Sequence, residues 1–151
     1  MKPLFVLLGT FGISLLATYF FTEAIDYPLS GRIAMSAMLV FTAIGHFAFT
    51  KGMAMMVPDF IPFKTEMVYA TGVIELLAAI GLLIPGLKVL AAWALILFFI
   101  VLLPGNIKAA IKRIDYEKGT YEGKGITYLW FRVPLQILFI AWTYLSAIMF
   151  P

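Results

Sequence analysis

The chain has 151 residues, of which 63% are hydrophobic and only 13% are charged. Soluble domains are about 45–50% apolar, so the composition excludes an ordinary soluble domain and indicates an integral membrane protein with a single domain. The chain has no cysteine and one histidine, which excludes thiol–disulfide chemistry and argues against a self-contained zinc, haem or iron–sulfur centre. The net charge of +3 bears on membrane topology, and nucleic acid is not an expected partner.

Five apolar segments are each close to the ~20 residues that cross a bilayer as a helix. They are Pro3–Thr22, Ile33–Thr50, Met67–Ile84, Lys88–Pro104 and Tyr128–Phe150. The first has some features of a signal peptide, but its apolar core is long and Phe21–Ala24 lacks a clean cleavage pattern, so we expect it to be retained. The sequence therefore predicts an all-α membrane protein, with an N-terminal transmembrane helix and outer loop in residues 1–32 and a four-helix bundle in residues 33–151.

The basic residues of the loops are divided unequally between the two sides of the membrane. With five crossings, one side holds eight of them: Lys2, Lys51, Lys64, Lys108, Lys112, Arg113, Lys118 and Lys124. The other side holds only Arg32 and Lys88. The positive-inside rule then predicts a multi-pass protein of the cell (inner) membrane, with the N-terminus in the cytoplasm and the C-terminus outside.

Glu75 lies near the middle of the third apolar segment, with no other charged residue within eight positions on either side. A carboxylate in hydrocarbon costs a few kcal/mol or more unless it finds a partner, water or a proton. Its helical neighbours are all small (Thr71, Gly72, Ala78 and Ala79), as is typical of the side of a membrane helix that packs on other helices. We therefore expect Glu75 to point into the bundle.

Four more polar residues are expected at a similar depth, within roughly 12 Å of the inner surface. They are His46, Asn106, Arg132 and Gln136. Our hypothesis is that Arg132 pairs with Glu75 and that the other three complete a ligand-binding polar pocket that opens inward. The apolar loop between the second and third segments, with Pro58, Asp59, Phe60 and Pro62, would form the lid of this pocket, since such a segment lies in the interface or folds back into the protein.

Plainer interpretations of the same residues stay open. A Glu75–Arg132 pair is also consistent with a purely structural role that sets the helix register. Arg132 is close enough to the helix end to extend to the inner head groups, which would leave Glu75 protonated. A single histidine near a helix end, such as His46, is more often a hydrogen-bonded structural residue than a ligand.

Five short motifs in this order resemble the DoxX family of small membrane proteins. They are Ile44–Phe47, Met56–Pro62, Gly72–Leu76, Leu103–Ile107 and Arg132–Gln136. The resemblance covers about residues 33–150 and implies a four-helix transmembrane bundle, to which the first apolar segment is an addition. It also implies an association with redox complexes, and the matching site residues are His46, Glu75, Asn106, Arg132 and Gln136.

Three functions are consistent with these observations. The first is a non-catalytic or redox-associated subunit that binds a quinone or a lipid in the polar pocket; no intrinsic cofactor or metal is expected. No catalytic centre is visible within the chain, so a role in a quinone-linked oxidoreductase would require a partner protein. The second is a membrane partner or assembly protein with a structural polar core, and a homo-oligomer is open in either case. The third is a proton-coupled transporter, although the outer half offers few polar groups to continue a path.

Overall fold

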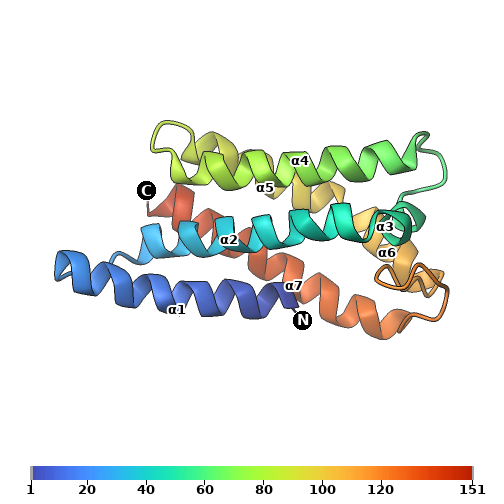
Figure 1. Ribbon diagram of the computed structural model, residues 1–151, viewed down its shortest axis with the longest axis horizontal. Helices are drawn as coiled ribbons and strands as arrows, with labels where there is room; N and C mark the ends of the chain where they lie inside the picture. Colours follow the sequence, from blue (N-terminus) through green and yellow to red (C-terminus); the bar gives the residue numbers. More distant parts are fainter. Residues whose placement is uncertain (1, 151) are drawn as a thin grey trace.

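The computed structural model describes residues 2–150, and its regular secondary structure is helical apart from one isolated bridge between Asp115 and Thr120 (Figure 1). The elements are α1 Lys2–Thr22, α2 Tyr27–Ala48, α3 Thr50–Met56, α4 Lys64–Leu83, α5 Lys88–Val101, α6 Leu103–Ile111, α7 Ile126–Tyr144 and the short π-helix η1 Leu145–Met149. This architecture confirms the all-α part of the predicted fold class.

Five helices are long and apolar enough to cross a membrane. They are Lys2–Thr22, Tyr27–Ala48, Lys64–Leu83, Lys88–Ile111 and Ile126–Met149. The fourth combines α5 with α6, and the fifth combines α7 with η1. Helices satisfy their own backbone hydrogen bonds, which is the condition for crossing hydrocarbon. The five apolar segments predicted from the sequence correspond to these five helices.

The largest differences from the predicted segments lie in three elements. Helix α2 begins at Tyr27, because the Asp26 side chain accepts a hydrogen bond from the Leu29 backbone N–H at 2.8 Å and so caps the helix. The fourth span continues to Ile111 after a break at Leu102, and Pro104 stands in the first turn of α6, where its missing N–H is tolerated. Helix α3 occupies part of the segment expected to be a loop.

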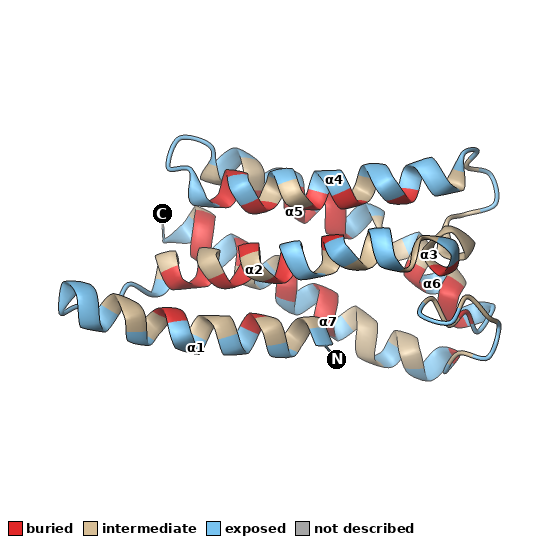
Figure 2. Ribbon diagram, in the orientation of Figure 1, coloured by how far each residue is buried: buried red, intermediate tan, exposed pale blue. Residues whose placement is uncertain are grey.

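The order in which the helices pack decides which side chains can meet. Helix α4 packs against α2, α5 and α3, whereas α7 packs against α5, α6 and α2. Figure 2 shows the buried residues on the facing sides of these helices, and they form one core: Leu7, Ala34, Met35, Met38, Leu39, Ala79, Leu82, Ala92, Leu95, Phe98, Phe99, Leu135, Phe139 and Ala147. A carboxylate on α4 therefore faces α2 more readily than α7.

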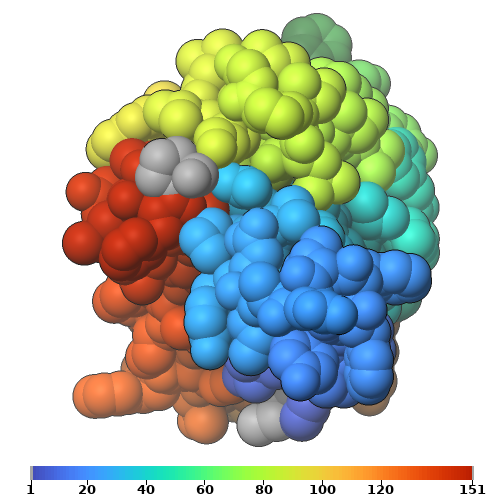
Figure 3. All heavy atoms as spheres, turned by 90° about the vertical axis from the view of Figure 1, so that its left-hand side faces the viewer, coloured from blue at the N-terminus to red at the C-terminus, as the bar shows by residue number. Residues whose placement is uncertain are grey.

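Helix α1 lies on the outside of the bundle. It packs mainly against α2, and in the end-on view of Figure 3 its blue surface covers one edge of the molecule while α4, in yellow-green, lies at the top. Only Leu7 and Ser14 of α1 are buried. Phe11 makes an edge-on contact with Trp142, with the ring centroids 4.8 Å apart. The first helix is therefore peripheral to the core.

One end of the bundle carries the polar connections. Helix α3, residues 57–63, α6 and residues 112–125 gather there (Figure 1). Gly52 of α3 lies so close to the Tyr116 backbone that a Cβ at this position would collide with the Tyr116 carbonyl group. Lys2 joins this end through an ion pair with Glu117 at 3.0 Å. We call this the basic end.

Candidate functional site

The buried carboxylate of Glu75 pairs with His46 across the interface between α2 and α4. The His46 Nε2 atom lies 3.4 Å from Glu75 Oε1, and the side chains are 12% and 5% exposed. The Thr42 hydroxyl donates a hydrogen bond to Glu75 Oε2 at 2.8 Å. Both carboxylate oxygens thus have a polar partner on α2, which is how a charge is tolerated at this depth in a membrane.

The other nitrogen of His46 faces α4. Its Nδ1 atom lies 3.2 Å from the Val68 carbonyl oxygen and 3.0 Å from the Thr71 hydroxyl oxygen. As an imidazolium, His46 donates from both nitrogens, toward α4 and toward Glu75. The Thr71 hydroxyl donates its proton to the Val68 carbonyl at 2.8 Å, so its oxygen is an acceptor for an Nδ1–H of His46. Both ring nitrogens therefore have a polar neighbour.

Gly72 allows α2 and α4 to approach at the level of this pair. A Cβ at position 72 would lie 3.0 Å from the His46 Cβ and 3.3 Å from the Phe47 ring. Farther along the same interface, the Ser36 hydroxyl donates to the Ala79 carbonyl at 2.8 Å. Small residues and hydroxyl groups therefore give this interface both its closeness and its polar contacts.

The predicted pairing of Glu75 with Arg132 is wrong. Within residues 2–150 the ionic partner of Glu75 is His46, and Arg132 lies half-buried on α7, which packs against helices other than α4. The charge of Arg132 acts instead on Tyr116, at the basic end. Burial raises the pKa of the Tyr116 phenol, and Arg132 opposes this rise. Glu75 and Arg132 were expected at a similar depth in the membrane. The helices that carry them, α4 and α7, pack mainly against other helices.

Asn106 and Gln136 form a second polar group, between α6 and α7. The Asn106 amide donates to Gln136 Oε1 at 3.2 Å, and the Gln136 amide donates to the Phe99 carbonyl next to the break between α5 and α6. The Tyr128 hydroxyl contacts Asn106 Oδ1 at 3.4 Å. The five residues expected to line one pocket are thus divided between an α2–α4 group and an α6–α7 group, with Arg132 outside both.

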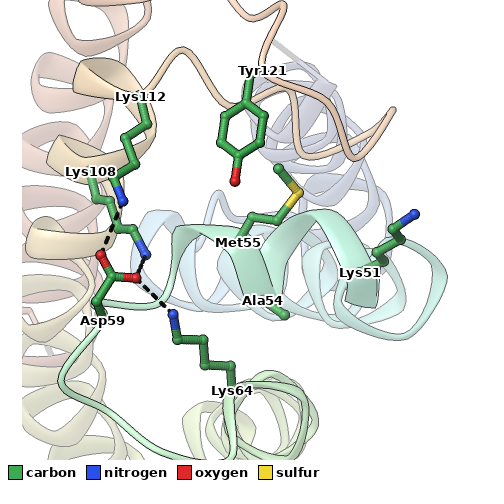
Figure 4. A pocket seen from close by; sticks show the side chains of 8 residues that line it. All are labelled: Lys51, Ala54, Met55, Asp59, Lys64, Lys108, Lys112 and Tyr121. Carbon is green, nitrogen blue, oxygen red and sulfur yellow. Dashed lines mark hydrogen bonds and ion pairs between the residues drawn. The ribbon is translucent and has the colours of Figure 1, made fainter.

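A pocket of about 300 Å³ lies at the basic end (Figure 4). We call it the lysine pocket, and it is lined by Lys51, Ala54, Met55, Asp59, Lys64, Lys108, Lys112 and Tyr121. It contains four lysines and one carboxylate, so its walls carry a net charge of +3 when all are ionised (4 − 1). None of the five predicted polar residues lines it.

Three of these lysines converge on Asp59. Oδ1 accepts from the ammonium groups of Lys64 at 2.9 Å and Lys108 at 2.8 Å, and Oδ2 accepts from Lys112 at 3.1 Å. These hydrogen bonds, above all the one from Lys108, hold the pKa of the Asp59 carboxyl well below its usual range. Asp59 is therefore ionised at any physiological pH.

The segment expected to be a lid contributes one residue, Asp59, to the lining of this pocket. Its Asp59 is tied to α6 through Lys108 and Lys112, and the Val57 carbonyl accepts a further hydrogen bond from Lys108 at 2.6 Å. Phe60 and Phe63 are 85% and 75% exposed. In a membrane protein such aromatic rings suit the boundary between head groups and hydrocarbon.

The sequence contained a partial signal for the lysine pocket that the prediction did not use. Lys108 and Lys112 are four residues apart and so share a helical face, and Asp59 is the one acidic residue in the apolar run from Met56 to Phe63. The positive-inside rule uses these lysines only as markers of topology. Nothing in their spacing indicates that Asp59, about fifty positions earlier, meets them.

The fold and its polar interior define an all-helical protein with five helices long and apolar enough to cross a membrane, a buried histidine–glutamate pair and a lysine pocket at one end. A family model described as a domain of unknown function, DUF8561, matches residues 35–147, and the chain belongs to this family. The expected membership of the DoxX family is therefore wrong, since the match is to another family. No curated protein and no solved structure matches the chain.

The expected redox association rested on the DoxX resemblance, so it loses its support. The motifs that carried it are short and consist largely of Gly, Pro and single polar residues. Such residues recur in membrane bundles because helices need close approach, breaks and a few hydrogen bonds. The family match begins inside α2, so α1 lies outside the matched region.

Proposed function

We propose that this protein is a non-catalytic membrane protein that binds an anionic amphipathic molecule, a lipid, at the lysine pocket. The observation that carries the proposal is the convergence of three lysines on one carboxylate in a pocket of about 300 Å³ that a fourth lysine also lines. Lysines of like charge repel one another, so an excess of three positive charges is best stabilised by a bound anion.

The surroundings of the pocket favour a ligand that is charged at one end and apolar at the other. Met55 and Ala54 form part of the wall, and the exposed rings of Phe60 and Phe63 belong to the adjoining loop. If the basic end faces the cytoplasm, as the distribution of positive charge predicts, it meets the leaflet where anionic lipids are concentrated.

The charge of the pocket selects between the two ligand classes considered from the sequence. A quinone is neutral and needs only one or two hydrogen-bond donors, whereas an anionic lipid uses several ammonium groups at once. The group around Glu75 has its own partners within the protein: Thr42, His46 and Thr71. We therefore place ligand binding at the lysine pocket and give the Glu75 group a structural role.

Native mass spectrometry with lipid extraction tests the proposal. We expect gently purified wild-type protein to retain an anionic lipid that the double variant Lys108→Gln/Lys112→Gln loses. The matched control is Lys118→Gln/Lys124→Gln, which removes the same charge from exposed positions at the same end and should keep the lipid. Equal retention, or equal loss, in the two double variants would contradict binding at this pocket.

A second candidate is a partner or assembly protein, and it is favoured by the internal pairing of the polar core. Glu75, His46, Asn106 and Gln136 all find partners within the chain, which is expected where polar groups serve stability alone. The same mass spectrometry separates the two candidates. If this chain is a partner or assembly protein, the purified wild type should retain no lipid of defined mass.

A further inference from the structure

The lysine pocket already holds an anion, the side chain of its own Asp59. Three ammonium groups lie 2.8–3.1 Å from the two carboxylate oxygens. A carboxylate offers one charge and two oxygens, so three cations around it remain undercompensated. A phosphate monoester offers up to two charges and three oxygens, and it can accept a hydrogen bond from each lysine.

We propose that the ligand of the pocket carries a phosphate group, and that this phosphate binds by replacing Asp59 among the lysines. This rests on the proposed function and adds two claims to it, the chemical class of the head group and the exchange with Asp59. In the state described here Asp59 occupies the position of the phosphate and competes with it.

One of the three lysines, Lys108, has a partner other than Asp59. The Lys108 side chain is only 13% exposed, and its ammonium group is fixed by the Val57 carbonyl at 2.6 Å. Lys112 is the C-cap residue of α6, one turn after Lys108, and Lys64 stands at the first position of α4. Because both helices pack into the bundle, the backbone positions that carry the three lysines are fixed without Asp59.

Asp59, in contrast, stands in an exposed connection and is held through its contacts with the three lysines. Its side chain is 66% exposed, and it lies in the connection between α3 and α4, where a single backbone hydrogen bond, from Ile61 to Pro58, closes a turn. An exposed carboxylate recovers its hydration when it leaves, so the exchange costs little desolvation. The low pKa of Asp59 means that it competes as an anion at every physiological pH.

The pocket also has groups that Asp59 does not use. Lys51 lines it, and within residues 2–150 no hydrogen bond or ion pair engages the Lys51 ammonium group. Tyr121 projects into the same space, as Figure 4 shows, and its hydroxyl is a further donor. Tyr121 is therefore available to an anion larger than a carboxylate, whereas the Lys51 ammonium group points away from Asp59 in Figure 4.

Binding to protein in dodecyl maltoside micelles, which contain no phosphate, tests the inference. The probes are dioleoyl phosphatidic acid, oleate and inorganic phosphate, followed by native mass spectrometry and by the ³¹P NMR signal of the bound phosphorus. We expect phosphatidic acid to bind more tightly than oleate. If Asp59 holds the site about nine-tenths of the time, Asp59→Asn lowers the apparent Kd for phosphatidic acid about tenfold. Asp59→Glu keeps the competing charge and should stay near the wild-type value.

The outcomes separate the inference from the proposed function. Equal binding of oleate and phosphatidic acid, with no effect of Asp59→Asn, would overturn the phosphate and its exchange but leave anionic amphiphile binding intact. Weaker binding in Asp59→Asn, with Asp59→Glu unaffected, would show that Asp59 positions the lysines, which overturns the exchange. Binding of inorganic phosphate as tight as that of phosphatidic acid would support a phosphate site and overturn a lipid source. If no anion binds to the folded wild type or to either variant, both the inference and the proposed function fail.

Discussion

At the scale of single residues, the partner of a buried charge decides its role. Glu75 receives a hydrogen bond from Thr42 and faces His46, so its carboxylate does not depend on Arg132. Removal of one partner of a buried pair leaves the other charge uncompensated, which costs more than the pair itself contributes. This asymmetry allows the pairing to be tested by mutation.

We predict that His46→Ala destabilises the protein by about 3 kcal/mol, because it leaves Glu75 without its ionic partner. Arg132→Ala should cost about 1 kcal/mol or less, since the half-buried guanidinium group makes no contact with Glu75. Unfolding in mixed micelles with rising mole fraction of dodecyl sulfate measures both. Equal losses for the two variants, or a larger loss for Arg132→Ala, would contradict the assignment of His46 as the partner.

At the scale of the elements, the interface between α2 and α4 depends on the absence of a side chain at Gly72. A Cβ atom added at position 72 would lie only 3.0 Å from the His46 Cβ and 3.3 Å from the Phe47 ring. Because packed interiors transmit a misfit to their neighbours, an added methyl group moves the two helices apart where the histidine–glutamate pair lies.

Gly72→Ala is therefore expected to destabilise the protein by about 1–3 kcal/mol, the usual cost of overpacking. The matched control is Gly12→Ala in α1, another helical position, where a Cβ would meet nothing within 4 Å. The control should leave stability unchanged or slightly higher, since alanine is the better helix former. The same micelle unfolding assay applies, and a stabilising effect of Gly72→Ala would show that α2 and α4 are not in close contact.

At the scale of the whole molecule, the distribution of charge and the five spans predict the topology. The basic end holds the loops with eight of the ten loop cations, and the turn between α4 and α5 lies at the opposite end. Lysines and arginines are retained on the cytoplasmic side, so the lysine pocket should face the cytoplasm.

The natural absence of cysteine makes this topology measurable with single introduced thiols. We expect Gly86→Cys, in the α4–α5 turn, to react with a membrane-impermeant maleimide added to intact cells. Lys118→Cys, at the basic end, should react only after permeabilisation. The reversed pattern would place the lysine pocket outside, where the leaflet is less anionic.

Much of the fold could be predicted from the sequence, because membrane helices are marked by length and apolarity alone. The break at Leu102 and the start of α2 at Tyr27, after its cap Asp26, shifted two boundaries, since caps and local breaks depend on single side chains. Helix α3 was missed, because a seven-residue helix at a polar end is stabilised by its contacts. The wrong family assignment came from treating short motifs as specific.

The sequence by itself determined the class of protein and the number of spans, and it placed Glu75 inside the bundle. Each of these follows from the cost of exposing polar groups to hydrocarbon, which depends on local composition. Only the tertiary structure decided that Glu75 meets His46 and that Lys64, Lys108 and Lys112 converge on Asp59. These contacts join residues that are distant along the chain, and they depend on which helices are neighbours, a property that no local pattern of residues contains.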